Sequence, residues 1–226
     1  MKVCFFDIDG TLILSHGAGY QAFARAFRDL YGVTDLTRDV PFAGRSDRAI
    51  ALDLMTLHGI EATEDTWHEF QEVYLATLPE TLVACDGQVL PGVEALIAQL
   101  QTMDDVGLGL LTGNVIRGAE AKLTHFGLWH HFAFGGYGDI HPHRDDIARS
   151  AVLAASDHLK LARNDDSRLV VIGDTVHDIT CARAIGAYAV AVPTGFTPMD
   201  ELRAANPDLA VETLEDAQAL VDWLAE

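Results

Sequence analysis

Short apolar runs alternate along most of the chain with longer segments of helical periodicity. The apolar runs, each bounded by Gly, Asp or Pro as buried strands often are, lie at 2–6, 106–111, 168–172 and 187–192. Helical patterns lie between them, at 92–103, 115–125, 145–158 and 177–185. Strands that are apolar throughout and alternate with helices predict an α/β fold, in which helices cover both faces of a parallel sheet.

Residues 17–88 interrupt this alternation, because they show helical patterns only. These patterns span 19–31, 46–58 and 64–78. Ser46 and Thr63 stand where helix N-caps are expected. We therefore expect two domains, which are a core formed by 1–15 together with 89–226 and an all-helical insertion at 16–88.

Composition and charge exclude several classes of protein. Of the 226 residues, 49% are hydrophobic, which is typical of a globular chain rather than a disordered one. The net charge of −19 argues against nucleic acids and anionic membrane surfaces as partners. The first apolar run ends at Phe6, well short of the roughly 7–15 residues of a signal peptide or the roughly 20 of a membrane span. We expect a cytoplasmic protein with no membrane partner, in which Cys4, Cys85 and Cys181 are reduced.

Polar residues follow three of the predicted strands directly. They are Asp7 and Asp9 after the first, Thr112, Gly113 and Asn114 after the second, and Gly173, Asp174, Thr175 and Asp178 after the third. The carboxyl ends of parallel strands meet at one edge of a sheet, which is where open α/β sheets bind ligands. Carboxylates gathered there repel one another unless a cation neutralises them, and oxygen ligands suit Mg²⁺.

Three of these segments carry a family resemblance. Asp7-Ile8-Asp9-Gly10-Thr11, Leu110-Leu111-Thr112-Gly113-Asn114 and Gly173-Asp174-Thr175-Val176-His177-Asp178 resemble, in order, the first, second and fourth motifs of the haloacid dehalogenase superfamily. The chain is most similar to its phosphoglycolate phosphatase-like branch. The resemblance covers the whole chain and implies a Rossmann-like core with an inserted helical cap.

The resemblance also implies a role for each motif residue. Asp7 would be the nucleophile that forms an aspartyl-phosphate, and Asp9 the general acid and then base, which needs a carboxyl protonated at rest. Thr112 would donate a hydrogen bond to a phosphoryl oxygen. The residues that would surround the phosphate are Gly10, Thr11, Gly113 and Asn114. The implied cofactor is Mg²⁺, held by Asp7, Asp9 through its backbone carbonyl, Asp174 and Asp178.

The third motif departs from the family pattern, which places a Lys there. Arg144 stands at that position, and Arg and Lys are not interchangeable at a phosphate. Lys122 is the alternative cation, although its helix has an ordinary amphipathic pattern. A solvated surface charge is the competing interpretation of both. Arg45, before a helix of the insertion, is the candidate contact to the rest of the substrate.

These residues favour a Mg²⁺-dependent phosphatase that hydrolyses a small phosphorylated metabolite as a monomer or homodimer. A phosphomutase of the β-phosphoglucomutase type is an alternative, but its family pattern has a His twelve residues after the nucleophile, where this chain has Gly19 and only His16 nearby. Asp9 argues against a dehalogenase, whose branch lacks that acid. A non-catalytic phospho-binding module remains open because of Arg144.

Overall fold

A six-stranded parallel sheet forms the centre of the computed structural model, which describes residues 1–160, 168–195 and 197–226. The strand order is β5-β4-β1-β6-β7-β8, and every pairing is parallel. The strands are β1 (Lys2–Phe6), β4 (Val106–Leu111), β5 (Phe134–Gly136), β6 (Arg168–Gly173), β7 (Tyr188–Ala191) and β8 (Leu209–Ala210). This arrangement confirms the predicted α/β fold.

Alternate residues of the strands face two separate layers of helices. Cys4 and Phe6 of β1 belong to the core on one face, against α4 (Val93–Gln101), α5 (Ile116–His125) and α9 (Gln218–Ala225). Val3 and Phe5 belong to the core on the other face, against α6 (Arg144–Leu159), α7 (Val176–Ala184) and α8 (Met199–Ala204). Because both faces are buried, the strands carry apolar residues at successive positions, as the sequence pattern required.

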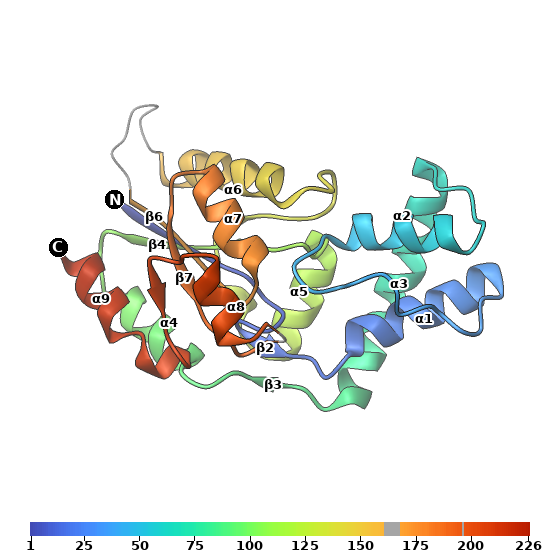
Figure 1. The fold of residues 1–226 in the computed structure, drawn as a ribbon, viewed down its shortest axis with the longest axis horizontal. Helices are drawn as coiled ribbons and strands as arrows, with labels where there is room; N and C mark the ends of the chain where they lie inside the picture. The colour runs from blue at the N-terminus through green and yellow to red at the C-terminus, as the bar shows by residue number, and fades with distance from the viewer. Residues whose placement is uncertain (161–167, 196) are drawn as a thin grey trace.

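Three helices form a second unit with its own core at one end of the molecule, opposite the end that carries both chain termini (Figure 1). They are α1 (Ala18–Tyr31), α2 (Asp47–Leu57) and α3 (Glu64–Cys85). The stripe of α3 that the sequence shows at helical spacing, including Trp67, Phe70 and Tyr74, is fully buried in this core. Two chain connections link the units, and they pair as the short antiparallel strands β2 (Ile13–Leu14) and β3 (Gln88–Val89).

Capping residues that the sequence predicts are found at the ends of the helices. The Ser46 and Thr63 side chains accept hydrogen bonds from backbone N–H groups three residues on, and Gly32 closes α1 in the left-handed conformation. The division into domains at 16 and 88 stays a prediction. No helix among the described residues combines the length and apolar character needed to cross a membrane, and the three cysteines are free thiols.

Helix α3 is longer than the predicted 64–78. It continues through Pro79 to Cys85, although proline removes a backbone donor inside a helix at a cost of about 3 kcal/mol. Thr81 and Leu82 are buried in the last turns, so packing against the neighbouring helices outweighs that cost. The sequence analysis also missed the short strands β2, β3, β5 and β8 and the helices α8 and α9, whose patterns are too short for periodicity to identify.

Candidate active site

The ends of three strands bring the predicted motif residues to one edge of the sheet. Phe6 of β1 lies in register with Leu110 of β4 and Ile172 of β6, so the residues that follow these strands are neighbours. The backbone N–H of Asp7 continues the ladder, donating to the Ile172 carbonyl at 3.0 Å. The motif segments therefore converge because the sheet is parallel and its central strands are in register.

Asp7, Asp174 and Asp178 form a buried cluster of carboxylates. One oxygen from each lies within 4.8 Å of the others, and the three residues are only 5%, 2% and 1% exposed. Arg144, on the first turn of α6, hydrogen-bonds Asp178 and lies 3.5 Å from an Asp7 oxygen. Its Nε is buried, and the guanidinium also lies beside the Cys181 thiol of α7.

Asp178 is held on both of its oxygens. One accepts from Arg144, and the other accepts from the Thr175 backbone N–H at 3.0 Å and from the Thr175 hydroxyl at 2.7 Å. These bonds form the capping box at the start of α7. Asp178 therefore orients Arg144 and the Asp174 segment, and its free capacity as a ligand is smaller than that of the other two carboxylates.

Burial raises the pKa values of the two remaining carboxylates. Desolvation raises the pKa of Asp7 to about 6, with help from the charges of Asp178 and Asp9 and against the opposing effect of Arg144. Desolvation, with the charges of Asp178 and Asp7, raises the pKa of Asp174 to about 8. Asp174 therefore needs a further cation to be ionised at neutral pH, whereas Asp7 is mostly ionised there without one. A cluster made only of hard oxygen donors fits Mg²⁺.

Two glycines leave the space that Asp174 occupies. Gly10 has φ of +85°, and a Cβ there would lie 2.4 Å from an Asp174 oxygen. A Cβ on Gly195 would lie 1.7 Å from the same oxygen. The Thr11 hydroxyl faces Asp174 at 3.4 Å, so it supports this carboxylate instead of lying free near a phosphate. Gly195, after β7, was missed by the sequence analysis.

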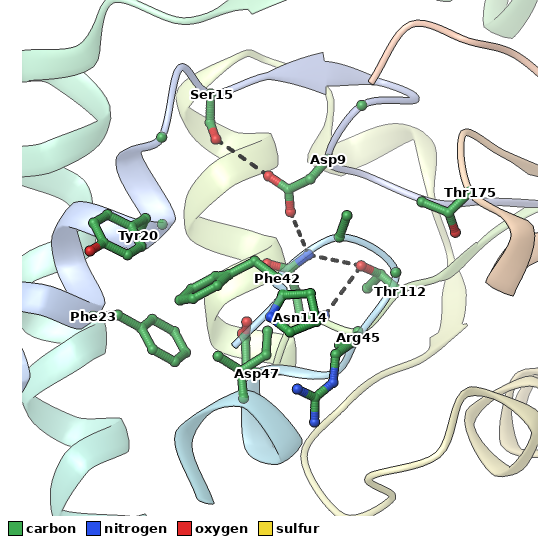
Figure 2. A pocket seen from close by; sticks show the side chains of 18 of the residues that line it. Asp9, Ser15, Tyr20, Phe23, Phe42, Arg45, Asp47, Thr112, Asn114 and Thr175 are labelled. Carbon is green, nitrogen blue, oxygen red and sulfur yellow. Dashed lines mark hydrogen bonds between the residues drawn. The ribbon is translucent and has the colours of Figure 1, made fainter. Parts of the chain in front are cut away.

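Asp9 lies at the centre of a second network (Figure 2). One oxygen of its carboxylate accepts from Lys122 Nζ at 2.6 Å and from Asn114 Nδ2 at 2.8 Å, and the other accepts from the Ser15 hydroxyl at 3.4 Å. Asn114 also donates to the Thr112 hydroxyl at 2.8 Å and accepts from Lys122 at 2.6 Å. Asn114 is thus placed to link Asp9 to Thr112.

This network changes the expected protonation state of Asp9. Desolvation would raise the pKa of Asp9, but the charge of Lys122 and the hydrogen bonds from Lys122, Asn114 and Ser15 outweigh it and hold the pKa below its usual range. Asp9 is therefore ionised in this arrangement, and the expectation of a carboxyl protonated at rest is not met. Lys122 and Arg144 are only 4% and 7% exposed, so neither is the solvated surface charge of the competing interpretation.

The loop before α2 lies directly against the second motif. Asp47 N–H donates to the Gly113 carbonyl at 2.8 Å, and the buried Asp47 carboxylate accepts from Val115 N–H at 3.0 Å at the start of α5. A Cβ on Gly113 would lie 2.1 Å from the Arg45 carbonyl oxygen. Gly113 thus allows the helical unit to close over the sheet edge, a role that the sequence analysis did not assign to it. Asp47 was also missed, because a buried carboxylate in a first helical turn looks like an ordinary favourable charge at that end.

Arg45 lines the resulting cavity, but its guanidinium is paired with Asp53 of α2 at 2.6 Å. The cavity has a volume of about 570 Å³. At its base lie Asp7, Asp9, Thr112, Asn114, Lys122, Arg144 and Asp174. Most of the sequence-predicted residues therefore line one cavity between the sheet edge and α1–α3, whereas Thr11 and Asp178 lie behind its lining.

The pKa shifts predict how magnesium stabilises the protein at different pH values. The free energy of unfolding of the metal-free protein should fall as pH rises from about 4 through 8. In this range Asp7 and Asp174 still bind protons in the folded protein, because their pKa values are raised, whereas the same groups in the unfolded chain have already lost them. Mg²⁺ should therefore raise the melting temperature more above the Asp174 pKa of about 8 than below the Asp7 pKa of about 6.

Thermal melts with and without Mg²⁺ at the two pH values measure this. The Asp174→Asn variant should lose the Mg²⁺ effect, whereas Asp216→Asn, which changes an exposed carboxylate elsewhere, should keep it. An equal magnesium shift at both pH values, or one that survives in Asp174→Asn, would contradict the assignment.

Comparison with known proteins agrees with this geometry. A model of the haloacid dehalogenase-like hydrolases matches residues 1–186. The chain is 29% identical to the probable phosphatase IndB of Dickeya dadantii, over 93% of this chain and 89% of that protein. It is 33% identical to a phosphoglycolate phosphatase of Synechococcus elongatus, over 61% of each chain.

Solved structures show the same fold. The crystal structure of CbbY from Rhodobacter sphaeroides in complex with phosphate superposes with a TM-score of 0.74 at 17% identity, covering 96% of both chains. A hydrolase from Pseudomonas syringae gives 0.71 at 22% identity, covering 100% of both. The family model, which spans most of the chain, carries the conclusion that this protein belongs to the haloacid dehalogenase-like hydrolase family.

Proposed function

We propose that the protein is a Mg²⁺-dependent phosphatase that hydrolyses a small phosphomonoester through an aspartyl-phosphate on Asp7. The observation that carries this proposal is the arrangement of two differently held carboxylates. Asp7 is buried beside Arg144, and Asp9, two residues on, is partly exposed and bonded to Lys122. Two such acids can take two roles, one as nucleophile and one as proton carrier.

The first step is attack by an Asp7 oxygen on phosphorus, which breaks the bond from phosphorus to the ester oxygen. Arg144 and the Thr112 hydroxyl line the space where the phosphoryl oxygens would lie, and they can stabilise charge that develops there. Magnesium would be held by Asp7, Asp174 and the Asp9 backbone carbonyl, with Asp178 orienting the group. When bound, it would supply positive charge to the phosphoryl oxygens and carboxylates.

Asp9 would give a proton to the leaving oxygen and then take one from the water that attacks the aspartyl-phosphate. The ion pair with Lys122 keeps Asp9 charged in the absence of substrate. A phosphate dianion that enters beside Asp9 would compete for Lys122 and add negative charge, and both effects raise the pKa of Asp9. Substrate binding would therefore favour protonation of Asp9, which the first step needs.

The phosphomutase alternative finds no support at position 19. A Cβ there would lie 3.6 Å from Lys122 Nζ, so this position faces the site, but glycine offers no acid or base. The relatives named phosphoglycolate phosphatase make phosphoglycolate one substrate to test.

Phosphate release from p-nitrophenyl phosphate tests the proposed activity. We expect release with Mg²⁺, none with EDTA, and a loss of at least about a hundredfold in Asp7→Asn, because the amide is a far weaker nucleophile than the carboxylate. Asp216→Asn is the matched control and should retain activity. Release that needs no metal and survives Asp7→Asn would overturn the mechanism.

The pH profile of Lys122→Met tests the role of Asp9. Removing the cation should raise the pKa of Asp9, so the alkaline limb of kcat, which reports loss of the protonated acid, should move to higher pH. Arg144→Met should instead lower kcat by about a hundredfold or more without that displacement, because it removes a donor at the phosphoryl group. An unchanged alkaline limb in Lys122→Met would show that Asp9 is not the proton carrier.

A further inference from the structure

The far side of the cavity is apolar and aromatic. Away from Asp7 and Asp9 it is lined by α1, α2, α3 and the loop before α2, with side chains Tyr20, Phe23, Val40, Phe42, Ile50 and Tyr74. The whole cavity, with its polar and apolar parts together, has a volume of about 570 Å³, which lies in the range of about 300–1,000 Å³ typical of pockets for drug-sized ligands. A phosphorylated two-carbon acid would leave most of this space unfilled.

The rings are held at fixed angles to one another. Phe42 meets Tyr20 at 5.4 Å and Phe23 at 5.3 Å between ring centroids, both edge to face, and Phe23 meets Tyr74 at 4.7 Å. Phe23 and Tyr74 are fully buried, whereas Tyr20 and Phe42 are partly exposed. Figure 2 shows Tyr20, Phe23 and Phe42 grouped on one side of the pocket, across from Asp9. The two partly exposed rings therefore offer a rigid aromatic surface to a ligand.

Two of the cations around the cavity already have polar partners that compete with a carboxylate on the leaving group. Arg45 is paired with Asp53, and Lys122 is held by Asp9 and Asn114. Arg38 also lines the cavity, at an exposed position, with its guanidinium 4.5 Å from the centre of the Tyr20 ring. An anionic leaving group would also lie near the buried Asp47 carboxyl.

Two polar groups lie together in the aromatic region. The Tyr74 hydroxyl is buried in the wall of the cavity beside the Asp47 carboxyl, which also lines the cavity. A carboxyl in an otherwise apolar wall can pair with a polar atom of a ligand ring, such as an amino or ring N–H group. The site thus suits a flat ring that carries polar atoms.

From these observations we infer that the substrate is a phosphomonoester whose alcohol carries a flat heteroaromatic ring, and that Phe42 and Tyr20 bind this ring while Asp7 and Asp9 act on the phosphate. The inference rests on the proposed phosphatase function and specifies its substrate class. Aromatic side chains bind flat rings by stacking, and this interaction depends little on which heteroatoms the ring contains. The helical unit then determines which substrates are preferred, and residues at the sheet edge hydrolyse the phosphate ester.

A substrate panel tests the inference. We expect kcat/KM for adenosine 5′-monophosphate, uridine 5′-monophosphate or pyridoxal 5′-phosphate to exceed that for 2-phosphoglycolate and glycerol 3-phosphate by at least about tenfold. Phe42→Leu, which keeps apolar bulk but removes the ring, should reduce the advantage of the best ring ester over glycerol 3-phosphate by about tenfold, the effect of losing one stacking partner. Phe42→Tyr should restore it.

A matched control comes from the same helix as Tyr20. Tyr31 is aromatic, partly buried and outside the cavity, so Tyr31→Leu should leave the substrate ratio unchanged. Preference for 2-phosphoglycolate over every ring ester, lost in Arg38→Gln, would overturn the inference in favour of carboxylate recognition.

Binding measurements separate this inference from the proposed function. Adenosine and uridine 5′-monophosphates and pyridoxal 5′-phosphate are titrated calorimetrically into the Asp7→Asn variant, with and without Phe42→Leu. At least one should bind, about tenfold more weakly when the ring is lost. Ring-dependent binding without hydrolysis by the unaltered protein would contradict the phosphatase proposal and keep the ring site. Absence of ring-dependent binding with all three would overturn the ring site, even if other esters are hydrolysed.

Discussion

Four carboxylates meet at one edge of the sheet, where two basic side chains among the described residues form ion pairs with them. Lys122 is bound to Asp9, and Arg144 is bound to Asp178. Asp7 and Asp174 are left with less neutralisation, which is why burial and like charges raise the pKa values of both. This imbalance makes the site receptive to a cation, next to the positive charge of Arg144 that lines the same cavity.

The fold supports this concentration of charge by close approach of the backbone. Gly10 and Gly195 leave room for Asp174, and Gly113 lets the loop before α2 contact the second motif. That loop continues into Phe42 and Arg45, so the same contact that encloses the reacting groups also positions the aromatic wall. Burial of Asp7, Asp174 and Asp178 strengthens the electrostatic interactions among these carboxylates. Under the proposed function, the sheet edge supplies the chemistry and the helical unit the substrate choice, and this loop is where the two units meet.

The sheet and the strand-end motifs could be predicted from the sequence, because buried parallel strands give continuous apolar runs and acidic residues directly after them stand out. The ionisation of Asp9 could not be predicted, because it depends on Lys122, which lies 113 positions away in sequence. The same holds for Asp47 and Gly195, whose partners come from distant segments. The end of α3 at Cys85 depends on packing that outweighs the local effect of Pro79.

The covalent aspartyl-phosphate is the centre of this account, and trapping it is the most direct test. The Asp9→Asn variant lacks both the acid of the first step and the base of the second, but p-nitrophenyl phosphate has a leaving group that departs without a proton. Acid quenching during turnover of this ester should therefore leave a phosphoryl group on the peptide that contains Asp7, identified by mass spectrometry. The account predicts this modification at Asp7 and its absence when Asp7 is changed to Asn as well. A phosphoryl group on another residue, or rapid phosphate release by Asp9→Asn with no phosphorylated protein, would contradict it.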